Sequence, residues 1–299
     1  MTIFSLELAD VAMSAHSLPA TGRLNLRPVP RVKNLSADEF RESYLKAGRP
    51  LVISDMASTW PAVKKWTPEY FAREYGTLPV KVYDKGFVRA GKSYMSSLRK
   101  IPFGEYLQLM LTSALDLRLF AFNIFWQAPE LKQDLLWPEI TTGFSKKFVF
   151  MFFGCKGAVT PVHYDPDLPH LLHTVLYGKK RVVLFANQES KNLYKHPFNT
   201  RSYVDIDQPD FDKFPRLRAA TGYQATIHPG ETLFMPSGCW HYMVYEEAGY
   251  AVCTRCAKLP PASKVRAYVN LLVCFPIDKI MNKLFPDSWF KWKEKRARR

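Results

Sequence analysis

The sequence predicts a mainly β fold with helical additions, in which eight short strands form a two-sheet barrel of the jelly-roll type. From residue 148 onward, short runs of β-branched and aromatic residues are separated by Gly and Pro, which is typical of a small antiparallel β domain. Before and after this region, apolar residues recur at helical spacing. No window approaches the ~18 apolar residues that a membrane-spanning helix needs, so we expect no contact with a membrane.

These changes in composition and apolar spacing divide the chain into four parts. We expect an extended N-terminal lead over residues 1–30, whose stretch from Arg23 to Pro30 is rich in Pro and Arg, and an N-terminal α/β part over 31–145 that packs on the barrel. The core of the barrel then covers 146–258. C-terminal helices and a basic tail occupy 259–299.

The N-terminal part begins with a capping box, in which Ser36 and Glu39 open a helix that Gly48 and Pro50 end. Thr67 precedes Pro68 and predicts a second helix start. The elements expected here after the first helix are a strand over 51–54, a helix over 67–76, a strand over 80–83, a helix over 103–115 and a strand over 119–126.

The barrel strands are expected over 148–153, 160–165, 171–177, 180–186, 223–227, 231–235, 240–245 and 249–255. A helix over 263–275 follows them. We expect Pro276 to interrupt this helix, and the helical pattern to resume over 277–285. Residues 291–299 read as a solvated basic tail.

Composition narrows the class of protein. The 299 residues are 47% hydrophobic and 23% charged, as in an ordinary globular chain. Five cysteines do not make a disulfide framework, and the first twenty residues lack the basic start of a secretory signal. We therefore expect a cytoplasmic protein, or a nuclear one in a eukaryote. The net charge of +15 favours contact with polyanions or acidic partners and says nothing about catalysis.

One group of His and Asp residues has the side chains of a metal site. His163 and Asp165 lie two residues apart in a predicted strand, so both side chains leave the same face. Downstream, His241 follows a Pro-Gly turn, a predicted strand and a second turn. Two imidazoles and a carboxylate make the facial triad that binds non-haem Fe(II) and leaves positions open. An isolated His-x-Asp is common by chance, and it is the downstream segment and the neighbouring Lys180 that favour a metal site.

Three segments together resemble the JmjC or cupin-like family of Fe(II)- and 2-oxoglutarate-dependent oxygenases. They are Thr160–Asp165, Gly178–Phe185 and His228–His241. Residues 49–53, 60–62 and 65–70 are similar to the family as well. Within the family, the sequence is similar to protein asparaginyl hydroxylases and to tRNA wybutosine hydroxylases. The resemblance implies a double-stranded β-helix, the jelly roll of cupin and JmjC proteins.

The resemblance also implies a ligand set. His163, Asp165 and His241 correspond to the iron ligands, with 2-oxoglutarate as cosubstrate and O2 as oxidant. Lys180 corresponds to the partner of the distal carboxylate of 2-oxoglutarate, and Thr160 donates a hydrogen bond to it. A buried dicarboxylate needs such a cation to offset its desolvation. Because strand alternation sends one face inward, we expect only one of residues 179–181 to enter the core, and we expect it to be Lys180.

The sequence departs from the family pattern around this set. Leu171 or His170 stands where the asparaginyl hydroxylases have an asparagine, and residues 120–123 lack their cosubstrate-binding tyrosine. His170 and His173 are three apart in a strand, so at most one of them faces the site. On the last barrel strand, Arg255 either reaches the iron-side carboxylate of the cosubstrate or is a surface charge.

Two further patterns have simple structural interpretations. Cys253 and Cys256 face opposite sides of a predicted strand, which favours buried small hydrophobes over a zinc or redox pair. Aromatic residues near the entrance favour core and rim packing, with a methyl-lysine cage as the alternative. They are Trp126, Trp137, Trp240 and Tyr242.

The function expected from the resemblance is hydroxylation of an amino-acid side chain in a protein substrate, with release of succinate and CO2. The alternatives are hydroxylation of a modified tRNA base, N-methyl demethylation, a catalytically silent cupin-like binding module, and a basic RNA-binding protein with an incidental pocket. The charge also makes RNA or the ribosome a candidate partner. Apolar residues at 265, 269, 272 and 273 and at 280, 281 and 284 form a homodimer contact, as such helices commonly do in this family, or pack against the barrel.

Overall fold

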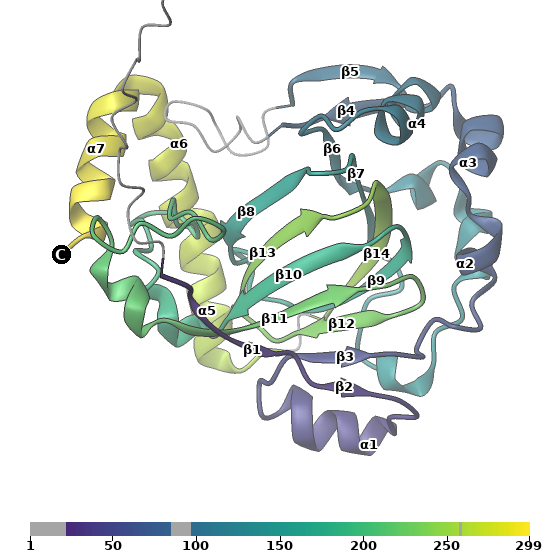
Figure 1. The fold of residues 1–299 in the computed structure, drawn as a ribbon, viewed down its shortest axis with the longest axis horizontal. Coiled ribbons are helices and arrows are strands. Elements are labelled where there is room, and N and C mark those ends of the chain that lie inside the picture. The colour runs from purple at the N-terminus through teal and green to yellow at the C-terminus, as the bar shows by residue number, and fades with distance from the viewer. Residues whose placement is uncertain (1–21, 85–96, 257–258) are drawn as a thin grey trace, which may run out of the picture.

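Two β-sheets face each other in the computed structural model, which describes residues 22–84, 97–256 and 259–299 (Figure 1). Most of the expected N-terminal lead, residues 1–21, lies outside the described residues, as do 85–96 and 257–258. The five-stranded sheet runs β1 (Asn25–Pro28), β11 (Thr221–Ile227), β10 (Lys180–Phe185), β13 (Trp240–Tyr245) and β8 (Val159–His163). The seven-stranded sheet runs β2 (Arg31–Val32), β3 (Leu51–Ile53), β12 (Thr232–Met235), β9 (His170–Tyr177), β14 (Gly249–Cys256), β7 (Val149–Gly154) and β6 (Arg118–Phe122).

The alternation of chain segments between the sheets makes this a jelly roll. Strands β9, β10, β11 and β12 lie between β8 and β13 in the chain, and β8 and β13 pair with each other. All eight strands expected between 148 and 255 are present, with ends within two residues of the predicted ones. The predicted fold class is therefore confirmed. A separate pair, β4 (Pro79–Val82) and β5 (Arg99–Pro102), lies beside the barrel.

Helices surround the sheets. The N-terminal helices are α1 (Ala37–Glu39) with the π-helix η1 (Phe40–Leu45), α2 (Pro61–Lys65), α3 (Pro68–Tyr75) and α4 (Phe103–Thr112). Short 3-10 turns are η3 (Ile124–Trp126), η4 (Pro129–Asp134), η5 (Glu139–Thr141), η6 (Asn187–Ser190) and η7 (Pro215–Ala219). The C-terminal run comprises α5 (Pro261–Val269), the π-helix η8 (Asn270–Cys274), α6 (Phe275–Leu284) and α7 (Pro286–Ala297).

The predicted helix starts are confirmed by their caps. The Ser36 hydroxyl accepts a hydrogen bond from the backbone N–H of Glu39 at 3.1 Å, and the Thr67 hydroxyl accepts one from Tyr70 at 3.1 Å. Each cap satisfies a backbone donor that has no partner within its helix.

Two N-terminal expectations were wrong in part. The lead segment contains β1, which pairs in parallel with β11 at the edge of the five-stranded sheet. An edge strand gives its backbone groups partners and tolerates Pro28 there, which the Pro-rich composition conceals. The strand expected over 119–126 ends at Phe122, and its last residues form η3.

The C-terminal expectations need two corrections. Pro276 does not interrupt the helix, because the preceding turn widens into the π-helix η8. The wider turn relieves the clash between a proline ring and the carbonyl of the previous turn. The basic tail is not a solvated tail either: it lies largely in α7, where Lys293 is buried and pairs with Asp278 at 2.5 Å.

Three apolar clusters hold these layers together. The largest packs α2, α3 and α4 against the outer face of the seven-stranded sheet, with Trp66, Phe71 and Tyr250 among its members. Another cluster lies between the two sheets and includes Val182, Leu184 and Leu233. This interlayer core fills only part of the barrel, because other inward positions carry the polar residues described below.

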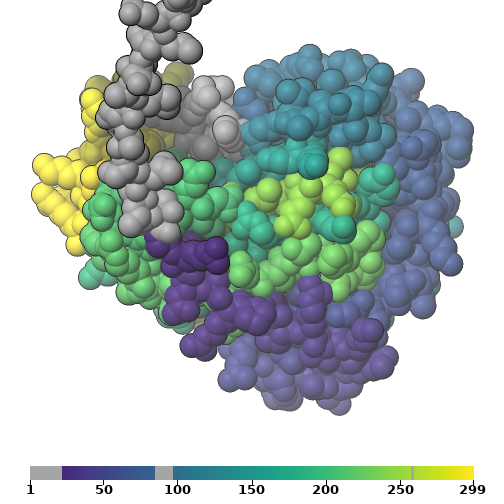
Figure 2. Space-filling model, viewed as in Figure 1, coloured from purple at the N-terminus to yellow at the C-terminus, as the bar shows by residue number. Residues whose placement is uncertain are grey.

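The N-terminal elements and the C-terminal helices cover different sides of the barrel. Figure 2 shows the N-terminal elements, in blue, on one side of the barrel and the C-terminal helices, in yellow, on the opposite side. The third cluster joins the C-terminal helices to the five-stranded sheet and the segments around 193–217. Among the described residues, no helix is both long and apolar enough to cross a membrane.

Candidate metal centre

A cavity of about 240 Å³ opens between the two sheets. Strands β8, β10 and β13 line one side, and β6, β7, β9, β12 and β14 line the other. Most of its wall is apolar, and its polar groups come from a few positions. These polar positions are Thr160, His163, Asp165, Asp167, His173, Lys180, His241, Tyr245 and Arg255.

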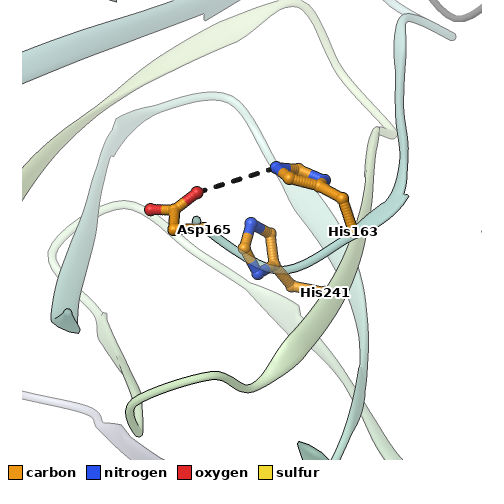
Figure 3. A group of neighbouring side chains, drawn as sticks. All are labelled: His163, Asp165 and His241. Atoms are coloured by element: carbon orange, nitrogen blue, oxygen red, sulfur yellow. Dashed lines mark ion pairs between the residues drawn. The ribbon is translucent and has the colours of Figure 1, made fainter. Parts of the chain in front are cut away.

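Three of these side chains point toward one another (Figure 3). His163 ends β8, His241 lies on β13 directly opposite it, and the two imidazole centroids are 4.2 Å apart. The ligand atoms of His163, Asp165 and His241 all lie within 4.8 Å of one another. The structure thus brings together the predicted triad, although Asp165 lies just beyond the strand rather than in it.

Backbone carbonyls fix which nitrogen each imidazole presents. His163 Nδ1 lies 2.8 Å from the carbonyl of Pro161, and His241 Nδ1 lies 3.1 Å from that of Cys239. A carbonyl can only accept, so both Nδ1 atoms carry the proton and donate. Both Nε2 lone pairs therefore face the cluster, as metal ligands require.

Burial keeps the His163 imidazole neutral. Desolvation lowers the pKa of His163 well below its ordinary value, and the nearby His241 and Arg201 lower it further. A neutral imidazole binds a cation without first losing a proton. The site is therefore prepared for a metal at neutral pH.

Arg255 orients the carboxylate of the triad. Its Nη2 donates to Asp165 Oδ2 at 2.8 Å and to Asp167 Oδ1 at 2.7 Å. The other oxygen, Asp165 Oδ1, faces His163 Nε2 at 3.8 Å. One carboxylate oxygen is thereby held away from the cluster, and the other is left for a metal.

Lys180 is the buried cation of the cavity. Its side chain is 2% exposed, and its Nζ lies 3.1 Å from His173 Nε2 and 4.1 Å from the centre of the Tyr245 ring. Its neighbours Lys179 and Arg181 instead pair with Glu247 and Asp207 at the surface. The prediction that only Lys180 of these three enters the core is confirmed.

The sequence comparisons agree with this geometry. Residues 36–259 match the cupin-like domain family. The chain belongs to the cupin-like domain family. The resemblance to the JmjC and cupin-like family of Fe(II)- and 2-oxoglutarate-dependent oxygenases is confirmed at the level of the family.

Two curated relatives show what this cupin-like protein is similar to. It is 30% identical over 240 residues to lysine-specific demethylase 8 of Xenopus tropicalis, covering 75% of this chain and 52% of that protein. It is 28% identical over 249 residues to tRNA wybutosine-synthesizing protein 5 of Homo sapiens, covering 75% of this chain and 76% of that one. The chain thus spans about half the length of the demethylase relative.

The residues of this cupin-like domain fit the metal and cosubstrate of the family. Two imidazoles and one carboxylate are the donor set that suits non-haem Fe(II). In the same cavity, Lys180 is a buried ammonium group that forms no ion pair with any described Asp or Glu. A dicarboxylate that binds the metal at one end would supply that missing counter-ion at the other.

Other predicted positions of the cupin-like domain divide between cavity and core. Thr160, Leu171 and Phe120 line the cavity, whereas Asn123 does not. His170 faces away from it, and its Nδ1 accepts from the backbone N–H of Ser237 at 3.1 Å. This confirms that at most one of the two strand histidines faces the site.

The aromatic cage alternative is wrong for the four residues considered. Trp126 is 69% exposed, Trp137 packs edge-to-face on Trp60, and Trp240 and Tyr242 are buried on the other side of the five-stranded sheet. None of them lines the cavity. Cys253 lines it and Cys256 lies in the core behind it, which confirms that the pair faces opposite ways.

Sequence reasoning missed two features of the site. Asp167 lines the cavity and shares Arg255 with Asp165, and its only sequence signal is its place two residues after that ligand. The contact between His173 and Lys180 joins β9 to β10, which belong to different sheets. No local pattern encodes a contact of that kind.

Proposed function

We propose that the chain is an Fe(II)- and 2-oxoglutarate-dependent dioxygenase that hydroxylates an amino-acid side chain in a protein, releasing succinate and CO2. One observation carries the proposal: the cluster of His163, Asp165 and His241 shares a cavity with Lys180, a buried cation without a described counter-ion. A silent binding module has no physical need for a metal-ligand set and a desolvated ammonium group in one cavity.

Each residue then has a task. His163, His241 and Asp165 line the cavity and would hold the metal there. Lys180 on β10 would hold the distal carboxylate of the cosubstrate, and Thr160 on β8 would donate a hydrogen bond to it. Bound Fe(II) and 2-oxoglutarate supply the oxidising chemistry, in which one oxygen atom of O2 enters succinate and the other the substrate.

The cavity walls support a side chain as the reacting group. Most of the lining of the cavity is apolar, which favours an amino-acid side chain over a charged nucleotide as the reacting group. Phe120, Phe150, Phe152 and Met235 form an apolar wall that excludes water from the reacting atoms.

Two other substrates are favoured by specific observations. Relatives named lysine-specific demethylases favour N-demethylation, and relatives named tRNA wybutosine-synthesizing protein 5, with the +15 charge, favour a modified tRNA base. Hydroxylation keeps the new oxygen in the product. Demethylation loses it with formaldehyde.

The experiment supplies the purified protein with Fe(II), 2-oxoglutarate and isotopically heavy O2, together with either a protein extract or a tRNA pool. Asp165→Ala serves as the matched control. The proposal expects heavy oxygen in a protein fragment only with the wild type. Label in tRNA alone, or formaldehyde release without retained label, would replace the proposed reaction by one of the alternatives.

We also propose that a second copy of the chain covers the C-terminal helices. Apolar side chains on α5, η8 and α6 are exposed instead of packing on the barrel, and Leu272 is 70% exposed. Monomers rarely expose a contiguous apolar face of this kind. The exposed side chains are Val265, Tyr268, Val269, Leu271, Leu272, Val273, Ile277, Ile280 and Leu284.

A further inference from the structure

Lys180 is stabilised by groups that carry no negative charge. His173 on β9 accepts a hydrogen bond from its ammonium group at 3.1 Å, and the face of the Tyr245 ring on β13 lies 4.1 Å away. An imidazole nitrogen and an aromatic face both favour a cation without neutralising it. This arrangement differs from the usual buried lysine, which pairs with a carboxylate.

The carboxylates of the same cavity are held elsewhere. Asp165 and Asp167 both accept from Arg255. Among the residues that the structure describes, no Asp or Glu forms an ion pair with Lys180. The positive charge of Lys180 is therefore left to whatever anion enters the cavity.

A carboxylate in place of His173 would have the opposite effect. It would pair with Lys180, satisfy the buried cation from within the protein, and repel the carboxylate of an incoming ligand. A neutral imidazole instead accepts from one N–H of the ammonium group and supplies no negative charge, so the cation keeps donors for a ligand in the cavity that it lines.

We propose that His173 is a positioning residue that holds Lys180 without supplying a counter-ion, so that the distal carboxylate of the bound dicarboxylate becomes that counter-ion. This inference rests on the proposed function. It assigns to His173 the selection of a dicarboxylate over a keto acid that lacks the second carboxylate.

The proposal has a consequence for protons. Burial lowers the pKa of Lys180 to about 7, so the empty site loses its proton as the pH rises above that value. A bound carboxylate favours the charged form and raises this pKa again. Above pH 7 the dicarboxylate therefore takes up one proton as it binds, and its affinity falls as the pH rises.

The other titratable groups around Lys180 do not change charge in this range. They are His173 on β9, Tyr245 on β13 and Cys253 on β14. Burial lowers the pKa of His173 well below its ordinary value, raises that of Tyr245, and raises that of Cys253 to about 12. On β10 itself, Lys179 and Arg181 face outward and pair with surface carboxylates.

The test compares His173→Glu with His173→Gln, which keeps a neutral acceptor. The purified proteins are titrated without oxygen, in the presence of Fe(II), with 2-oxoglutarate and with pyruvate. Both keto acids chelate Fe(II) through the same atoms and give a visible charge-transfer band, but pyruvate lacks the distal carboxylate. Pyruvate binding thus also reports whether each variant has kept its metal site.

We expect His173→Glu to weaken 2-oxoglutarate binding by about tenfold or more while pyruvate binding stays unchanged. His173→Gln should stay within about threefold of the wild type for both. In the wild type, the dissociation constant for 2-oxoglutarate should rise about tenfold per pH unit above pH 7. That slope should flatten in His173→Glu, because Lys180 then keeps its proton with or without ligand.

Three results would overturn the inference while leaving the oxygenase proposal in place. They are undiminished 2-oxoglutarate binding in His173→Glu, an equal loss in His173→Gln and His173→Glu, and a parallel loss of pyruvate binding in His173→Glu. A wild-type protein that gives no band with either keto acid would instead overturn the proposed function, and this inference with it.

Discussion

The guanidinium of Arg255 donates from Nη2 to Oδ2 of Asp165 at 2.8 Å, and this bond decides how the carboxylate meets a metal. Because Arg255 on β14 holds Oδ2 of Asp165, the other oxygen, Oδ1, faces His163. The geometry favours one ligand oxygen from Asp165 rather than two. Arg255 is therefore placed to orient a ligand, beyond the cosubstrate contact considered from the sequence.

Removing the guanidinium group that orients Asp165 should weaken metal binding. Groups that hold a metal ligand in place typically contribute about 10–100-fold in affinity, so Arg255→Leu should raise the dissociation constant for Fe(II) by that factor. Anaerobic titration with Fe(II), followed by calorimetry, measures it. Arg181→Leu is the control, because it removes a surface ion pair with Asp207 and leaves the cavity unchanged. Equal affinities for Arg255→Leu and wild type would show that Asp165 needs no such support.

Phe71 tests the packing of the N-terminal part on the barrel. Its ring is fully buried among Trp66, Phe103, Phe153 and Tyr250, at centroid distances of 5.6 to 5.8 Å. Phe71→Ala should lower the free energy of unfolding by about 3–5 kcal/mol, because it removes apolar contacts and leaves a cavity. Denaturant unfolding with fitted slopes measures this loss.

The exposed Phe148 is the control for this prediction. Phe148→Ala should change the free energy of unfolding by no more than about 0.5 kcal/mol. Similar values for the two variants would mean that α3 does not share a core with the barrel.

The C-terminal helices should mediate self-association. Light scattering coupled to gel filtration should give the mass of a dimer for the wild type. The double variant Leu272→Asp/Ile280→Asp should give that of a monomer, because a dimer would then bury charges in its apolar contact. Leu111→Asp, at an exposed position of α4, should stay dimeric. A monomeric wild type would rule out the second copy.

The barrel was predictable because each of its strands carries its own signal. The run Val182–Phe185 is apolar and comes shortly after Gly178, and the apolar or β-branched run Thr232–Met235 lies between Gly230 and Pro236, so these strands could be placed from local sequence. Strand β1 could not be placed, because its pairing depends on β11, nearly two hundred residues away. The continuity of the helix through Pro276 depends on a π-turn for which the sequence has no marker.

The candidate site likewise combines residues that the sequence could identify with contacts that it could not. His163, Asp165 and His241 were found because their turns and spacing are local, and Lys180 because strand alternation admits one of three neighbours. The partners of these groups follow from the registry of distant strands: Cys253 lies opposite His173, and Arg255 opposite Leu171, on adjoining strands. Such pairings form only when β9 and β14, which are distant in the chain, come together in the seven-stranded sheet.

The decisive measurement is the visible charge-transfer band that forms when Fe(II) and 2-oxoglutarate are added to the protein without oxygen. The wild type should give the band. Asp165→Ala should lose it with the metal ligand, and Lys180→Ala should weaken it, because the cation that holds the distal carboxylate is gone. Its absence from a folded wild-type protein that has bound iron, or its full strength in both variants, would show that this cavity is not an oxygenase site.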